Sequence, residues 1–294
     1  MSDCIEQMPN KWKDITAIAL TVKPGLEPCL WEGIQFSKLL LKKYSIPFIP
    51  IHHMEAHALI SSMFNKKITY PFLALLISGG HCLLAICHSE MKFERLGESI
   101  DMAPGNFIDK MARKMGLFTE ENSLSGGRLI ELKSLSGDPN SYPHLIRAVQ
   151  NYNKQNKNCD FSFSGFQSAM HRLIDQQLKK NNGKIDTANL CATVQHLIAL
   201  QLEDRLKRAL LFCKDLNIKH CVIAGGVAAN LYIKSYLTNV CSEFNIQTAI
   251  IPVEYCTDNG VMIAWNGVLV IFLIIFKIFA TKLFSFQTTY SLMF

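Results

Sequence analysis

The sequence contains ten cysteines but lacks any pair of them in the CxxC spacing. Several cysteines lie inside apolar runs, where a free thiol behaves as a small hydrophobic side chain. No secretory signal opens the chain, so a disulfide framework is not expected. We predict reduced thiols in the cytosol or in an organelle matrix.

Charge is also scarce, because charged residues make up only 18% of the chain and no segment alternates dense Lys/Arg with aromatic residues. The net charge of +6 permits a polyanionic partner such as RNA without requiring one. The first fourteen residues include Asp3, Glu6 and Asp14, which differs from an Arg-rich, acid-poor transit peptide. The hydrophobic content of 49% over 294 residues predicts a globular protein with one large domain or two lobes.

Two histidines stand four positions apart in residues 51–57, IHHMEAH. On a helix, His53 and His57 would lie on one face, where they could hold one divalent cation. A zinc protease of the HExxH type needs Glu directly after the first His, but here Met54 has that position and Glu55 follows it. The pair therefore predicts a metal site rather than a zinc protease. The alternative is two capped or solvated histidines.

The apolar patterns predict an α/β protein. Residues 15–22 and 46–51 are typical of buried strands, and residues 30–44 between them have helical spacing, so a βαβ unit leads to the histidines. Strands at 72–77 and 82–87 flank a turn, SGGH, whose backbone N–H groups could cradle a phosphate. An ordinary Gly-Gly hairpin is the alternative.

The second half alternates predicted helices with short strands. Residues 136–160 are polar and Asn-rich, which favours a long surface excursion. Strand 221–224 ends in Gly225-Gly226, a turn that lets a ligand approach a helix N-terminus, although many such turns bind nothing. Asp258 lies in a loop before helix 261–265, where its carboxylate could be a third metal ligand. The remaining predicted elements are helices 106–115, 166–180, 187–213 and 227–240 and a strand at 248–252.

These motifs occur together in a characteristic order. HHMEAH, LLISGGH, the Asp109–Lys110 helix, FSFSGFQ, AGGVAAN and CTDNGVMIAWNG follow one another over residues 15–267. Their combination resembles the TsaD/OSGEP family of tRNA N6-adenosine threonylcarbamoyltransferases, and it is most similar to the mitochondrial OSGEP-like branch. Each motif is weak alone, but their combination is specific.

The resemblance implies a two-lobed actin/sugar-kinase-like (ASKHA) fold with a nucleotide cleft. It implies transfer of the threonylcarbamoyl group from threonylcarbamoyl-AMP to N6 of adenosine 37 in tRNAs that read ANN codons, which forms t6A. It also implies mitochondrial location, a homodimer, and a YrdC-type synthetase that supplies the acyl-adenylate. One divalent ion per subunit is expected, either zinc, iron or magnesium.

The resemblance also implies site residues, by motif match. The metal ligands would be His53, His57 and Asp258. The acyl-adenylate site would be lined by Leu76, Ile77, Ser78, Gly79, Gly80, Asp109, Gly127 and Asn230. Backbone N–H groups at the Gly-Gly turns would be donors, and Asp109 or Asn230 would contact ribose or base. Asp101 receives no catalytic role, because Met102 follows it where the family has a second acid.

The resemblance is incomplete at both ends. The family's first strand and phosphate hairpin precede the point where this chain begins, so we expect an incomplete first lobe. Residues 1–69 and 258–267 are predicted to form that partial lobe, residues 70–257 the second lobe, and residues 268–294 a divergent tail. Residues 268–276 are nine apolar residues, and Lys277 interrupts the run, which makes a membrane helix marginal. We interpret the tail as an alternative or mispredicted final exon, with a membrane anchor as the alternative.

Two other functions stay open at this point. One is a metallopeptidase of the O-sialoglycoprotein endopeptidase type, against which Met54 argues. The other is a truncated isoform that binds metal or its partner subunit but transfers nothing.

Overall fold

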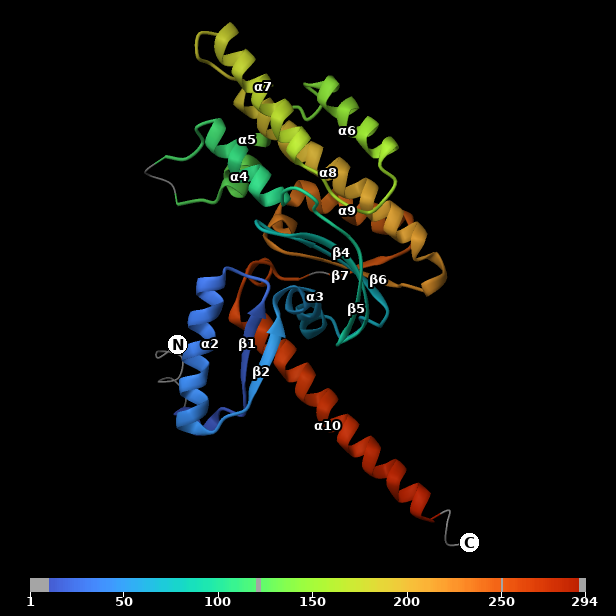
Figure 1. Cartoon of the computed structure of the whole chain (residues 1–294). Helices are drawn as coiled ribbons and strands as arrows, with labels where there is room; N and C mark the ends of the chain where they lie inside the picture. The colour runs from blue at the N-terminus through green and yellow to red at the C-terminus, as the bar shows by residue number, and fades with distance from the viewer. Residues whose placement is uncertain (1–10, 120–122, 250, 291–294) are drawn as a thin grey trace. The chain divides into compact units, whose positions relative to one another are not determined.

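A computed structural model describes residues 11–119, 123–249 and 251–290, and for Lys11, Val253 and residues 277–290 only the backbone is described (Figure 1). The fold is α/β, as the sequence predicts. Its contacts divide the chain into two units, residues 1–63 with 259–294, and residues 64–258. In the described residues, the first unit contains a two-stranded sheet and the second a five-stranded sheet.

The first unit is built on the predicted βαβ element. Strands β1 (Ile18–Lys23) and β2 (Phe48–His52) pair in parallel and are joined by helix α2 (Glu27–Tyr44). The helix begins three residues before the predicted position, because Pro28 lies within its first turn, where a missing N–H costs nothing. Lys42 and Lys43 lie in its last turn, where cations are favourable, and Ser45 ends it in a left-handed conformation.

Two further helices complete this unit, α3 (His53–Phe64), which continues one residue beyond it, and α10 (Gly260–Tyr290). The indole Nε1 of Trp265 donates to Ser62 Oγ at 2.9 Å and to the carbonyl of Leu59 at 3.2 Å, which joins α10 to α3. A Cβ added at Gly267 would lie 2.7 Å from the Cβ of Ala19, so only glycine allows α10 to lie this close to β1.

Helix α10 extends far beyond the predicted 261–265, and its backbone continues through residues 268–290. A short 3₁₀ turn, η1 (Lys11–Asp14), precedes β1. Among the residues that the structure describes, none of the helices combines the length and the apolar character needed to cross a membrane.

The second unit is organised by a mixed sheet of order β5-β4-β3-β6-β7. Strands β3 (Phe72–Ile77), β4 (Cys82–Ser89) and β5 (Lys92–Glu98) form an antiparallel meander, and β6 (His220–Ala224) and β7 (Gln247–Ala249) extend it in parallel. Strand β5 was not predicted from the sequence. This edge strand, KFERLGE, is mostly charged and buries only Gly97, so it lacks the apolar run that revealed β3 and β6.

Six helices lie over one face of this sheet (Figure 1). They are α4 (Pro104–Lys114), α5 (Gly126–Ser134), α6 (Pro143–Gln155), α7 (Ser164–Lys180), α8 (Thr187–Phe212) and α9 (Leu231–Glu243). Leu73, Leu75 and Ile77 alternate along β3 and join one hydrophobic core with these helices. Helix α8 is buried over most of its length, which explains why its sequence reads so clearly as a helix.

Two predicted elements were wrong. The polar excursion 136–160 contains α6, which buries Leu145, Val149 and Asn153 on one face while Arg147, Asn151 and Lys154 face water. The predicted helix 227–240 is divided in two, because η3 (Gly226–Ala229) ends at Asn230 and α9 begins after it. Two more 3₁₀ turns, η2 (Lys214–Leu216) and η4 (Val253–Tyr255), follow α8 and β7 respectively.

Candidate functional site

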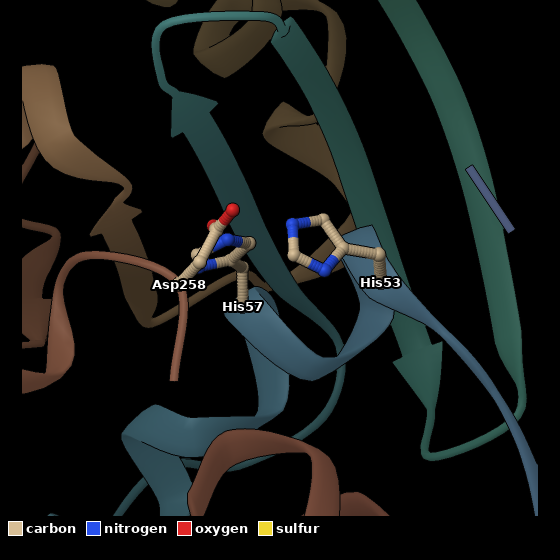
Figure 2. A group of neighbouring side chains, drawn as sticks. All are labelled: His53, His57 and Asp258. Atoms are coloured by element: carbon tan, nitrogen blue, oxygen red, sulfur yellow. The ribbon is translucent and has the colours of Figure 1, made fainter. Parts of the chain in front are cut away.

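His53, His57 and Asp258 form a cluster that could hold a metal ion (Figure 2). His53 opens α3 and His57 lies one turn later, so the helical period places both imidazoles on one face. Their ring centroids are 4.8 Å apart and the rings are perpendicular at 88°. Asp258 belongs to the loop that precedes α10.

The donor set fits a divalent cation. One ligand atom from each of the three side chains lies within 4.8 Å of the others. Metal–ligand bonds to His nitrogen and carboxylate oxygen are about 2.0–2.2 Å, so two ligands on one ion are at most about 4.4 Å apart. Small side-chain rotations therefore bring these atoms into bonding distance. Three protein ligands leave coordination positions for a substrate.

Glu55 does not complete a zinc-protease arrangement. Positions two apart on a helix point in different directions, so Glu55 lies off the face that carries the histidine pair. Burial raises the pKa of its carboxyl, and the charge of Lys23 opposes that rise only in part. This carboxyl is not placed to activate a water beside the two imidazoles.

The β3–β4 hairpin presents its glycines to open space. Ser78 and His81 close the turn, since the Ser78 N–H donates to the His81 carbonyl at 2.8 Å and the His81 N–H donates to Ser78 Oγ at 3.0 Å. A Cβ added at Gly79 or Gly80 would meet no atom within 4 Å. Leu76 and Ile77 are buried on β3 below the turn, which fixes its position. The glycine tip is therefore accessible to a ligand.

The N-terminus of α4 supports this hairpin. The Gly105 N–H donates to the Ser78 carbonyl at 3.2 Å, and a Cβ at Gly105 would lie 2.6 Å from the Cα of Gly79. One turn further along α4, Asp109 packs directly against Gly126 and occupies the space that a side chain at position 126 would need. Gly127 follows in the first turn of α5, where it is only partly buried. The structure thus brings together three of the predicted segments.

Asn230 is buried at 8% exposure and uses both ends of its carboxamide within the protein. Its Oδ1 accepts from the Ile233 N–H at 3.0 Å and caps α9, while its Nδ2 donates to Gln195 Oε1 at 3.2 Å. Gln195 in turn donates to Ser134 Oγ at 2.8 Å. This network joins α9, α8 and α5, and it gives Asn230 a structural part that the sequence analysis did not foresee.

Glu131, one turn after Gly127 on α5, was not predicted as a site residue from the sequence. Its carboxylate accepts from the Leu231 N–H at 2.8 Å and pairs with Arg128 at 2.7 Å. Glu131 lines a hollow of about 570 Å³ between α5, α8 and α9. The other lining residues include Arg128, Ser134, Gln195, Leu231 and Tyr232. The only sequence signal for Glu131 is its position four residues after Gly127, in the helix that follows the loop Ser125-Gly126-Gly127.

Asp101 has a structural part. Partial burial of Asp101 alone would raise the pKa of its carboxyl, but hydrogen bonds from Ser162, Phe163, Met102 and Ser164 outweigh this and hold the pKa below its usual value. The carboxylate accepts from the Phe163 N–H at 3.0 Å and the Ser164 N–H at 3.2 Å, at the start of α7. Asp101 therefore orders the N-terminus of α7.

A family model described as "TsaD: tRNA N6-adenosine threonylcarbamoyltransferase" matches residues 1–265. A protein of Mus musculus named mitochondrial tRNA N6-adenosine threonylcarbamoyltransferase is 45% identical over 268 residues, which cover 87% of this chain and 63% of that protein. The human protein of that name is 44% identical, with the same coverage. The tRNA N6-adenosine threonylcarbamoyltransferase of Ehrlichia chaffeensis is 37% identical and 74% covered. This chain thus spans less than two thirds of the mammalian relatives.

Solved structures give a more distant likeness. Full-length HypF in a phosphate- and nucleotide-bound form superposes with a TM-score of 0.58, over 91% of this chain and 49% of HypF. The sequences are only 15% identical, so this likeness concerns the fold alone.

Proposed function

Because this chain belongs to the TsaD family, we propose that it transfers the threonylcarbamoyl group from threonylcarbamoyl-AMP to N6 of adenosine 37 in tRNAs that read ANN codons. The transfer takes place in the mitochondrion, where the names of the mouse and human relatives place those proteins. The observation that carries this proposal is the His53–His57–Asp258 cluster, whose ligand atoms lie within 4.8 Å of one another.

These three side chains would hold one divalent ion. Bound there, the ion would supply Lewis-acid chemistry, which stabilises negative charge on a phosphate and polarises an acyl group. Neutral imidazole and carboxylate ligands suit zinc and iron, and magnesium would favour more oxygen ligands. The burial of His57 at 2% exposure fixes one imidazole, whereas exposed Asp258 can adjust to the substrate.

The second unit binds the acyl-adenylate. Backbone N–H groups at Gly79 and Gly80 donate to phosphate oxygens, and the absence of side chains there allows a close approach. Asp109 and Gly127 contact the ribose side of the ligand. Asn230 contributes mainly by fixing α9 against α8, since its carboxamide already bonds within the protein.

The two units are the lobes of an actin/sugar-kinase-like fold. The support is the sheet order β5-β4-β3-β6-β7, with an antiparallel meander followed by parallel strands, together with the fold likeness to HypF.

The protein acts as a homodimer and receives its acyl-adenylate from a YrdC-type synthetase. The dimer proposal is supported by α2, which exposes Trp31, Phe36 and Leu39, an apolar surface that a monomer would leave in water.

Light scattering tests the dimer. It should give twice the monomer mass for the wild type and the monomer mass for the double variant Phe36→Glu, Leu39→Glu. A monomeric wild type would contradict this part of the proposal.

Nucleoside analysis tests the transfer itself. The purified chain is incubated with threonylcarbamoyl-AMP and unmodified tRNA, and the digested tRNA is analysed by mass spectrometry. We expect t6A from the wild type and at least a hundredfold less from a His53→Ala, His57→Ala variant. A His88→Ala, His144→Ala variant removes two imidazoles outside the cluster and should retain the activity.

Failure of this assay has a defined meaning. A folded, metal-loaded wild type that gives no t6A would overturn the transferase proposal and leave a relative that binds metal without catalysing the transfer. The position of Glu55 gives no support to the peptidase alternative.

A further inference from the structure

Positive charge is concentrated on two neighbouring helices of the second unit. Helices α4 and α7 each carry three Lys or Arg residues and one acid, which leaves an excess of four positive charges on the pair. The whole chain has a net charge of only +6. The two helices contact each other, so their charges belong to one surface.

Side-chain contacts join these charges into one face. Lys110 Nζ donates to Gln167 on α7 at 3.4 Å, and Lys114 pairs with Asp175. His171 lies within electrostatic reach of Lys110, Lys114 and Asp175. The carboxylate of Asp175 therefore cancels part of the charge of one lysine and leaves the remaining cations in excess.

The outer cations of this face are available to a partner. Arg113 and Arg172 are exposed and make no ion pair with any acid among the residues that the structure describes. Lys179 is also exposed, and it lies one helical turn beyond Asp175. Guanidinium groups that point into solvent can bind phosphate oxygens in a bidentate manner without first breaking an internal bond.

The face begins at the proposed acyl-adenylate site. Helix α4 starts against the β3–β4 hairpin through Gly105, and Asp109 lies against Gly126 at the start of α5. Lys110 is the next residue after Asp109. Helix α7 has 17 residues and, at about 1.5 Å per residue, spans about 25 Å. That length can meet several phosphates of one strand.

We propose that this basic face, formed by Lys110, Arg113, Lys114, His171, Arg172 and Lys179, binds the phosphate backbone of the substrate RNA and holds its reacting adenosine at the acyl-adenylate site. The inference rests on the proposed function and assigns to these helices the RNA contact that it requires. Most of the binding is electrostatic, since a phosphate contact carries no sequence information.

The electrostatic surroundings of His171 support the inference. Burial and the charges of Lys114 and Lys110 lower the pKa of the imidazole despite the nearby Asp175. The cations therefore outweigh the acid at this point of the surface.

A membrane surface fits this face less well than RNA. A helix that lies on a bilayer inserts its apolar side among the lipids. The apolar sides of α4 and α7 are buried in the protein core, and neither helix exposes a large apolar side chain among the described residues.

Binding of unmodified tRNA at several salt concentrations tests the inference. The variant Arg113→Gln, Arg172→Gln is compared with the control Lys214→Gln, Lys219→Gln, which removes two exposed cations near the end of α8. Each lost phosphate contact reduces the slope of log affinity against log salt by about 0.7–0.9. We expect a slope reduced by roughly 1.5 and affinity reduced roughly tenfold at about 0.1 M salt in the first variant only.

Transfer kinetics provide a second measurement. The Arg113→Gln, Arg172→Gln variant should show a raised KM for tRNA and an unchanged kcat, because the substituted groups do not touch the reacting atoms.

The binding experiment also separates the two proposals. Equal binding by both variants would overturn the basic face, while binding of tRNA by the wild type would still support the proposed function. A wild type that does not bind tRNA would overturn both. Loss of binding to anionic vesicles, with tRNA binding intact, would assign the face to a membrane.

Discussion

At the scale of single residues, Asn230 shows how one buried side chain can hold several helices together. Its Oδ1 caps α9 and its Nδ2 holds Gln195, so the carboxamide connects three helices around the hollow lined by Glu131. Loss of the cap costs about 1 kcal/mol, and an unsatisfied Gln195 oxygen costs about 1–3 kcal/mol more.

Two substitutions at Asn230 separate the cap on α9 from the hydrogen bond to Gln195. Asn230→Ser keeps a capping oxygen and loses the bond to Gln195, whereas Asn230→Ala loses both. We expect urea unfolding to show a loss of about 2–4 kcal/mol for Ala and about 1 kcal/mol less than that for Ser. Equal losses would show that the cap contributes nothing. A loss of AMP affinity in a fully folded Ser variant would show that Asn230 also touches the ligand.

At the scale of secondary structure, the hairpin depends on the close packing of α4. A Cβ at Gly105 would overlap the backbone of Gly79 and lie 2.8 Å from the Ser78 carbonyl, so Gly105→Ala must displace the turn. We expect this variant to lose about 1–3 kcal/mol of stability and most of its AMP affinity, measured by urea unfolding and calorimetry. Gly80→Ala meets no neighbouring atom and should keep the stability of the wild type. Equal stability of the two variants would contradict the packing argument.

The start of α7 depends on Asp101, and this dependence varies with pH. The folded-state pKa of the carboxyl lies below its ordinary value of 3.8, so the ionised group stabilises the fold above about pH 4 and this contribution disappears as pH falls through the folded pKa. Asp101→Asn should therefore melt at a lower temperature than the wild type at about pH 7, with the difference shrinking towards about pH 3. A difference that does not vary with pH would show that ionisation of Asp101 does not stabilise the fold.

At the scale of the whole molecule, the metal cluster depends on residues that are far apart in the sequence. A ligand that binds only the folded state adds about 2.7 kcal/mol to the free energy of unfolding at a hundred times its Kd. Added zinc should therefore raise the Tm of the metal-free wild type by several degrees. Asp258→Asn should abolish most of this rise, whereas Asp215→Asn, at an exposed acid on η2, should retain it. An undiminished rise in the Asp258 variant would remove Asp258 from the ligand set.

The local elements of this protein follow from short stretches of its sequence. The four-residue spacing of His53 and His57 fixes their common face, and the apolar runs on either side of SGGH predict the hairpin. The α/β class and the family are confirmed, while the lobe boundaries and the roles of the site residues stay predictions. Such features depend on period and turn chemistry within about ten residues, which a single sequence displays directly.

Contacts between distant residues depend instead on the folding of the whole chain. Folding placed Asp258 beside a histidine pair two hundred positions earlier, made Asn230 a helix cap, and built α6 within an Asn-rich stretch. It also combined the cations of α4 and α7 into one face. These outcomes depend on burial and loop closure across the whole chain, and α6 is stable because Leu145 and Val149 find a core that the local sequence does not contain.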